Sequence, residues 1–324
     1  MLRTATLYAR LKALNVPCRE IVSLSNHTTM QVGGIAPVVA YVRSAEEMII
    51  AIREAKNNGV RYTVIGNGSN VIFSDSGFDG LVIVTTDMKK ISVEGNLIKA
   101  DCGASLTRLA VAAQRASLTG LEFAYGIPGT VGGGVFMNAG AFGGSLSDIV
   151  ISSICYDAKN DSIRKLDREE HAFHYRESIY MQNPDYIILG VLLELKAGKI
   201  EDIVAKMNEN IRARKEKQPL EFPSAGSVFR RPVGFYAGEL IEKCGLKDAW
   251  VELYNGGDYY NFDSWKATDD PNHFDHYWGR WDSVEKVMYK NGGGIEITPG
   301  SFEYEFVTKD GYLLALCDKI LKLL

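Results

Sequence analysis

The spacing of apolar residues predicts most helices and strands of the chain. Apolar side chains recur at helical spacing from residue 2 and stop before Pro17, which predicts a first helix. The same spacing predicts helices over residues 44–56, 105–116 and 200–217. Alternating or continuous apolar runs predict strands over residues 37–44, 61–66, 80–86, 148–157 and 186–196.

Short sequence motifs predict the start of one helix and the turn of one hairpin. Ser44, with Glu47 three residues on, predicts a capping box at the start of the second helix. Residues 91–103 predict a hairpin that turns at Glu94, Gly95 and Asn96. The elements over residues 36–86 therefore form a β-α-β unit, and those over residues 89–197 form a second α+β unit.

The chain is longer than one hydrophobic core usually allows. It has 324 residues, and single cores stop growing near ~250 residues. We predict three domains, over residues 1–88, 89–200 and 201–324. All four tryptophans fall between Trp250 and Trp281, so residues 250–324 differ in composition from the rest.

Charge and cysteine content narrow the class of protein. Forty acidic and 36 basic side chains give a net charge of −4, so we expect no nucleic-acid partner. The five cysteines include no C-x-x-C pair, which argues against a disulfide framework or zinc ribbon and favours a reducing cytoplasm. No stretch approaches the ~18 apolar residues of a membrane span, so we expect no membrane partner. The oligomeric state is unknown from sequence.

Two glycine-rich loops carry the first functional signal. Residues 126–144 hold eight glycines, and "GNGSN" at residues 66–70 directly follows a predicted strand. Glycine lets the backbone approach a ligand and lets successive N–H groups converge on an anion such as a diphosphate. The alternative is that both loops are tight structural turns. Neither loop fits the Rossmann or phosphate-loop pattern.

Several longer motifs resemble one family of enzymes. They are "HTTMQVGG" (27–34), "VIGNGSNVIFSDSGFDGLVI" (64–83), "GLEFAYGIPGTVGGGVFMNAGAFGG" (120–144), "YRES" (175–178) and "QPLEFPSAGSVFRRPVGFYAGELIEKCGLK" (218–247). In this order, over about three quarters of the chain, they resemble the UDP-N-acetylenolpyruvoylglucosamine reductase (UDP-N-acetylmuramate dehydrogenase) family.

The resemblance implies a fold, a reaction and a flavin site. The fold is α+β: two FAD-binding subdomains of the vanillyl-alcohol-oxidase (PCMH) type and a C-terminal α+β substrate-binding domain. In the family, NADPH reduces FAD, and the flavin reduces UDP-N-acetylglucosamine enolpyruvate to UDP-N-acetylmuramate for peptidoglycan synthesis. The implied flavin contacts are Gly66, Asn67, Gly68, Ser69, Asn70, Gly126, Pro128, Gly129, Thr130, Gly132, Gly133 and Asn138.

The resemblance also implies two catalytic residues. Hydride addition to an enol ether conjugated with a carboxylate makes an enolate-like charge, which needs a nearby cation and a proton donor. Arg176 matches the family's arginine at the substrate carboxyl, and Ser227 matches its proton donor. By residue type alone, such an arginine is more often on the surface and such a serine more often forms a turn.

Four other arginines and two histidines have weaker signals. The arginines are Arg212, Arg214, Arg230 and Arg231, which would either pair with the UDP diphosphate or form a solvated basic face. His171 and His174 precede Arg176 and are expected on the surface.

The pattern departs from the family after Lys247. The family's catalytic glutamate would fall at Gly300, and Glu303 or Glu305 would replace it only if the strand is shifted. The aromatic residues 250–281 would stack on a ligand ring or pack as a small core. The histidines near residue 275 lack the pattern of a metal site, so we expect none.

The sequence is compatible with two rival functions. One is an FAD- or nucleotide-binding homologue that has lost or redirected reductase activity through its altered C-terminal segment. The other is an FAD-linked oxidase of the same broad fold, which the "SAGSVF" motif disfavours.

Overall fold

The computed structural model describes residues 2–218, 220, 223–226 and 236–243, together with four short strands between residues 276 and 308. Contacts divide the chain into two compact units, Met1–Gly226 and Ser227–Leu324. The second unit includes α7 (Ala237–Lys243), β14 (His276–Tyr277), β15 (Lys286–Met288), β16 (Gly294–Glu296) and β17 (Val307–Thr308). The predicted domain boundaries at residues 88 and 200 stay predictions.

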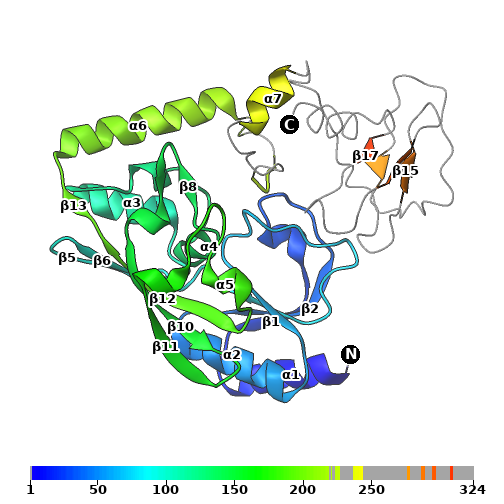
Figure 1. Ribbon diagram of the computed structural model, residues 1–324. Coiled ribbons are helices and arrows are strands. Elements are labelled where there is room, and N and C mark those ends of the chain that lie inside the picture. Colours follow the sequence, from blue (N-terminus) through cyan, green and yellow to red (C-terminus); the bar gives the residue numbers. More distant parts are fainter. Residues whose placement is uncertain are drawn as a thin grey trace. The chain divides into compact units, whose positions relative to one another are not determined.

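A four-stranded sheet opens the first unit (Figure 1). Its order is β1 (Cys18–Ser23), β2 (Ile35–Tyr41), β4 (Leu81–Val84) and β3 (Tyr62–Ile65). β2, β4 and β3 are parallel, and β1 is antiparallel to β2. Every residue of β4 is buried, as its continuous apolar run requires in the middle of a parallel sheet. The predicted β-α-β unit is confirmed, whereas β1 was not predicted.

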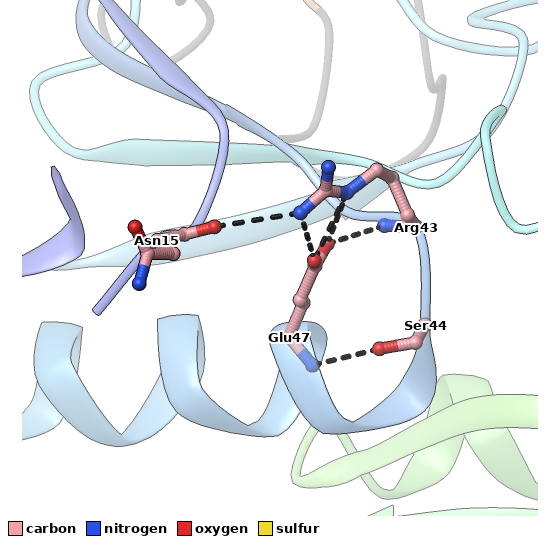
Figure 2. Close-up of polar contacts among 4 residues, drawn as sticks. All are labelled: Asn15, Arg43, Ser44 and Glu47. Atoms are coloured by element: carbon pink, nitrogen blue, oxygen red, sulfur yellow. Dashed lines mark hydrogen bonds and ion pairs between the residues drawn. The ribbon is translucent and has the colours of Figure 1, made fainter.

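The helices α1 (Leu2–Ala13) and α2 (Ala45–Asn57) pack on this sheet. The structure at the start of α2 corrects one prediction (Figure 2). Ser44 Oγ accepts from the Glu47 N–H at 3.2 Å, as a cap should. The Glu47 carboxylate, however, accepts from the Arg43 N–H at 2.8 Å and pairs with the Arg43 guanidinium. The predicted capping box is therefore only half formed, because Arg43 provides stronger, charged donors than Ser44 does.

A five-stranded antiparallel sheet forms the other half of the first unit. Its order is β11 (Ser162–Asp167), β10 (Val150–Asp157), β12 (Tyr186–Glu194), β6 (Leu97–Asp101) and β5 (Ile91–Glu94). The predicted hairpin is confirmed as β5 and β6, with Gly95 at φ +58° in the left-handed region that a tight turn needs.

Helices and short segments complete the first unit. α3 (Leu106–Arg115) and α6 (Ile200–Lys217) confirm two predicted helices. α6 buries Ile203, Met207 and Asn210 against the unit, and the Asn210 Nδ2 donates to Glu122 O at 3.0 Å. The remaining elements are α4 (Val131–Phe136), α5 (Ile179–Gln182), η1 (Leu24–His27), η2 (Glu122–Ala124), η3 (Leu146–Asp148), η4 (Arg168–His171), β7 (Leu118–Thr119), β8 (Gly140–Ala141), β9 (Gly144–Ser145) and β13 (Lys196–Ala197).

Both sheets share one hydrophobic core. A single cluster of buried residues runs from α1 and α2 through β4 to α3, α4 and β12. Contacts from α2 also reach the β10–β11 hairpin: Arg53 pairs with Asp161 at 2.6 Å, and Lys56 Nζ donates to Ala158 O. The elements that carry the two glycine-rich loops therefore belong to one compact unit.

Candidate functional site

The two predicted glycine-rich loops meet in the structure. The first loop, residues 66–70, follows β3. The first part of the glycine-rich stretch 126–144, residues 126–133, is called the second loop below and includes the first residues of α4. Asn67 Nδ2 donates to Pro128 O at 2.6 Å. A Cβ atom on Gly66 would overlap the Thr130 side chain. Glycine at position 66 thus allows the close approach of two loops that lie 60 residues apart in the sequence.

The first loop leaves a row of backbone donors unused. No described residue accepts a hydrogen bond from the backbone N–H groups of residues 67–70. Gly68 has φ +62°, and a Cβ there would overlap the His27 carbonyl oxygen. Alternation of left-handed and ordinary residues turns successive N–H groups toward one side, which forms a nest for an anion.

The second loop uses its backbone donors inside the protein. The N–H groups of Val131 and Gly132 donate to the carbonyls of Ala104 and Cys102, at 2.8 and 2.7 Å. The Gly133 N–H donates to Thr130 Oγ1 at 3.3 Å. A Cβ on Gly132 would lie 2.8 Å from the Cys102 Cβ. The glycine here is required by packing, whether or not a ligand is present.

A cavity of about 260 Å³ lies where the loops meet. Four of the predicted flavin contacts line it, namely Asn67, Pro128, Gly129 and Thr130. Its other lining residues, which no sequence pattern singles out, are Thr86, Lys89, Gly103, Ser105 and Arg108.

Two of those residues bring positive charge to the cavity. Arg108 forms no ion pair with another described residue, and Lys89 has only an exposed contact of 3.6 Å with Asp87. Ser105 stands at the start of α3, where the helix dipole also favours an anion. A single basic residue in the β4–β5 connection and another on a helix have no distinctive sequence pattern, so the sequence does not single them out.

The Arg176 guanidinium contacts backbone carbonyls of the segment that follows the second loop. Its Nη1 and Nη2 donate to Asn138 O and Gly140 O, at 3.3 and 2.7 Å. The guanidinium also stacks over Tyr175, with 5.2 Å from Cζ to the ring centroid. Its recorded contacts are these two carbonyls and the Tyr175 ring, and no described carboxylate forms an ion pair with it. The charge is oriented by neutral acceptors and stays available to an anion.

Asn138 has a structural role that the sequence did not suggest. Its Nδ2 donates to His174 O at 2.9 Å, and its Oδ1 accepts from the Ser147 N–H at 3.0 Å. Only 7% of the residue is exposed. Its side chain therefore fixes the segment that carries Arg176, and its predicted flavin contact stays a prediction.

The segment before Ser227 lies beside the first loop. Ser224 N donates to Thr29 O at 3.2 Å, and Thr29 Oγ1 donates to Ser224 O at 2.5 Å. A Cβ on Gly226 would have Asn70 Oδ1 as its nearest neighbour, at 3.5 Å. Other predictions lie outside the described residues, and they concern Ser227, Arg230, Arg231, Gly300, Glu303, Glu305 and the side chains of residues 250–281.

Arg212 and Arg214 differ although they share one helix. Arg212 is exposed and lies 3.9 Å from Glu216. Arg214 is half-buried over the Phe142 ring, and its Nε has no hydrogen-bond partner among the described residues. Burial lowers the pKa of the Arg214 guanidinium. Arg214 is thus no part of a solvated face.

His171 was wrongly expected at the surface: it is 0% exposed, whereas His174 is exposed as predicted. Among the described residues, no group of acidic, cysteine and histidine side chains is arranged to hold a metal ion. No helix in the described part of the chain is long and apolar enough to cross a membrane.

Comparisons with known proteins agree with this geometry. An FAD binding domain model matches residues 36–164, which include the first loop and the second loop. A model of the UDP-N-acetylenolpyruvoylglucosamine reductase C-terminal domain matches residues 218–253. These matches confirm the predicted α+β FAD-binding fold.

Relatives that match most of the chain share one name. The chain is 42% identical over 239 residues to UDP-N-acetylenolpyruvoylglucosamine reductase of Clostridium novyi, covering 72% of this chain and 77% of the relative. It is 40% identical over 295 residues to that of Lactiplantibacillus plantarum, covering 90% and 94%. The crystal structure of the Thermus caldophilus reductase superposes with a TM-score of 0.62 at 28% identity, covering 95% and 96%. The chain belongs to the UDP-N-acetylenolpyruvoylglucosamine reductase family.

Proposed function

We propose that this chain is the FAD- and NADPH-dependent reductase that converts UDP-N-acetylglucosamine enolpyruvate to UDP-N-acetylmuramate in peptidoglycan precursor synthesis. One observation carries the proposal: the N–H groups of residues 67–70 have no described acceptor, and Asn67 of this row lines a cavity together with Lys89 and Arg108. Backbone donors and fixed cations are the groups that bind a diphosphate. No feature of the described residues favours a homologue without reductase activity.

The residues present fit FAD. Asn67 and the N–H groups of residues 67–70 would hold the diphosphate, with Lys89 and Arg108 neutralising its charge. Gly129 lines the same cavity, and a Cβ there would make only ordinary contacts, with Leu106 and Ser69 at 3.6 Å. Bound FAD would supply the hydride-transfer chemistry, with NADPH as its reductant.

The chain's own groups would bind and polarise the substrate. Arg176, oriented by two carbonyls and unpaired with any described carboxylate, suits the enolpyruvyl carboxylate and the charge that develops beside it. Ser227 is proposed as the proton donor. The described residues 223–226 bring the chain to Thr29 and Asn70, so this serine directly follows a segment anchored at the first loop. A cytoplasmic location, expected from the cysteines, is part of the proposal.

An anaerobic experiment in two steps tests this function. NADPH is added to the purified flavoprotein, and loss of the visible flavin absorbance is followed. UDP-N-acetylglucosamine enolpyruvate is then added, and we expect the absorbance to return. A flavin that stays reduced after the substrate is added would contradict the proposal.

Matched arginine variants make the test specific. In Arg176→Lys, loss of the two-pronged donor should slow reoxidation roughly 10- to 100-fold, while reduction by NADPH is retained. Arg115→Lys is the control, because Arg115 is exposed in the last turn of α3 and does not line the cavity. Equal slowing in both variants would argue against a substrate role for Arg176.

A further inference from the structure

Three buried side chains form a hydrogen-bonded chain beneath the segment that carries Arg176. Ser153 Oγ lies 2.7 Å from His171 Nε2 and 2.5 Å from Tyr180 OH. Ser153, His171 and Tyr180 are exposed by 1%, 0% and 1%. They come from β10, η4 and α5, so three elements meet at one hydroxyl.

His171 and Tyr180, the two residues that Ser153 links, flank residues 172–178, which we call the arginine segment. His171 precedes the segment and Tyr180 follows it closely, so the Ser153 hydroxyl ties both of its ends to one strand. Within the segment, His174 and Glu177 exchange backbone hydrogen bonds of 3.1 and 3.3 Å. Its ends and its turn are therefore both fixed.

The hydrogen bonds among Ser153, His171 and Tyr180 all run in one direction from donor to acceptor. His171 Nδ1 faces Arg168 O at 3.3 Å, and a carbonyl only accepts, so Nδ1 carries the proton. Nε2 then accepts from Ser153, and Ser153 accepts from Tyr180. Burial lowers the pKa of His171, which keeps the imidazole neutral as this direction requires.

This arrangement is not that of a nucleophilic serine. A serine beside a histidine suggests acyl transfer, but a substrate has no access to side chains exposed by 1% and 0%. The ring stacks on Phe173, with centroids 4.9 Å apart, and no carboxylate of a described residue accepts from Nδ1. The side chains are placed to hold structure, not to react.

We propose that Ser153, His171 and Tyr180 form a clamp that holds the arginine segment in place and so positions Arg176 for the substrate. Its effect on catalysis rests on the proposed function; its effect on the segment does not. Arg176 itself has φ +56°, a conformation that a non-glycine residue keeps only when its surroundings impose it. The clamp, Asn138 and the carbonyls that hold the guanidinium supply those surroundings.

Hydrogen exchange tests the clamp without substrate. In Ser153→Ala, which removes both side-chain hydrogen bonds, amide exchange of residues 172–178 should be about tenfold faster than in the wild type. Ser152→Ala is the matched control, since Ser152 is the neighbouring strand residue and is 5% exposed. Ser153→Thr, which keeps the hydroxyl, should restore slow exchange. Unchanged exchange in Ser153→Ala, or equal acceleration in Ser152→Ala, would overturn the clamp.

The two half-reactions connect the clamp to catalysis. Reduction of the flavin by NADPH in Ser153→Ala should stay within twofold of the wild type, while reoxidation by substrate slows about tenfold and recovers in Ser153→Thr. Equal losses in both half-reactions would assign Ser153 a general structural role. If the wild type itself is not reoxidised by substrate, the proposed function fails, and hydrogen exchange still decides whether the clamp exists.

Discussion

The first loop leaves its backbone N–H groups without described acceptors, whereas the second loop uses several of its own inside the protein. Both loops are rich in glycine, but for different physical reasons. In the first, Gly68 adopts φ +62° and helps to form a nest of donors. Past the second, the carbonyls of Asn138 and Gly140 hold the Arg176 cation. The first loop thus suits an anion. The segment after the second loop holds the Arg176 cation, which can bind an anion.

The largest expected effect separates two adjacent glycines of α4. Gly132→Ala should lower the free energy of unfolding by about 2 kcal/mol, because the new Cβ would lie 2.8 Å from Cys102 Cβ in a buried contact. Gly133→Ala gains the same helix propensity but meets only Thr130 Oγ1, at 3.4 Å, so it should be neutral or slightly stabilising. Urea unfolding of the two variants measures the difference. Similar losses in both would show that the second loop is not packed as tightly as described.

Much of the fold was predictable because its signals are local. The apolar spacing of α2, α3 and α6 and the turn at Gly95 depend on residues within a few positions of one another. The half-formed capping box shows the limit of this argument, because a residue outside the motif, Arg43, competes for the Glu47 carboxylate.

The site was only partly predictable, because its contacts link distant positions. The glycine loops stood out by composition, but that they meet follows from Asn67 and Pro128, which are 61 residues apart. His171 was expected at the surface because its partner Ser153 lies 18 residues earlier, on another element. Lys89 was overlooked because an exposed lysine beside Asp87 looks like any solvated pair.

The next effect in size is a pH dependence of stability that arises at the buried network of Ser153, His171 and Tyr180. Because burial lowers the pKa of His171, the unfolded chain binds a proton near pH 6.5 that the folded chain does not. Stability should be full above that pH and should fall below it, by up to about 1.4 kcal/mol per pH unit, toward the lower folded pKa. Glu170 and Asp167, which favour the charged ring, reduce the effect, and Cys155 and Tyr180 are the other titratable groups at the network.

Unfolding measured between pH 5 and 7 in two variants checks this assignment. His171→Gln should remove the extra slope, and His174→Gln should keep it, because His174 is exposed. The carboxylates whose pKa values are lowered, Asp157, Asp161 and Glu47, lose their contribution only at more acidic pH. A slope that is the same in both variants would mean that His171 is not the group that titrates.

The smallest effect distinguishes two neighbouring lysines near the first loop. Lys89 lines the cavity and Lys90 does not, although both are exposed. Lys89→Gln should weaken FAD binding about fivefold, because an exposed charge near a diphosphate contributes ~1 kcal/mol. Lys90→Gln changes the net charge equally and should leave the Kd almost unchanged. Titration of the apoprotein with FAD at low and high salt makes the comparison. The difference should shrink as salt screens the charge.

If both variants weaken binding alike, the general field of the protein attracts the diphosphate. If only Lys89→Gln does, the cation acts within the cavity, and the first loop is the half of the site that binds the anion.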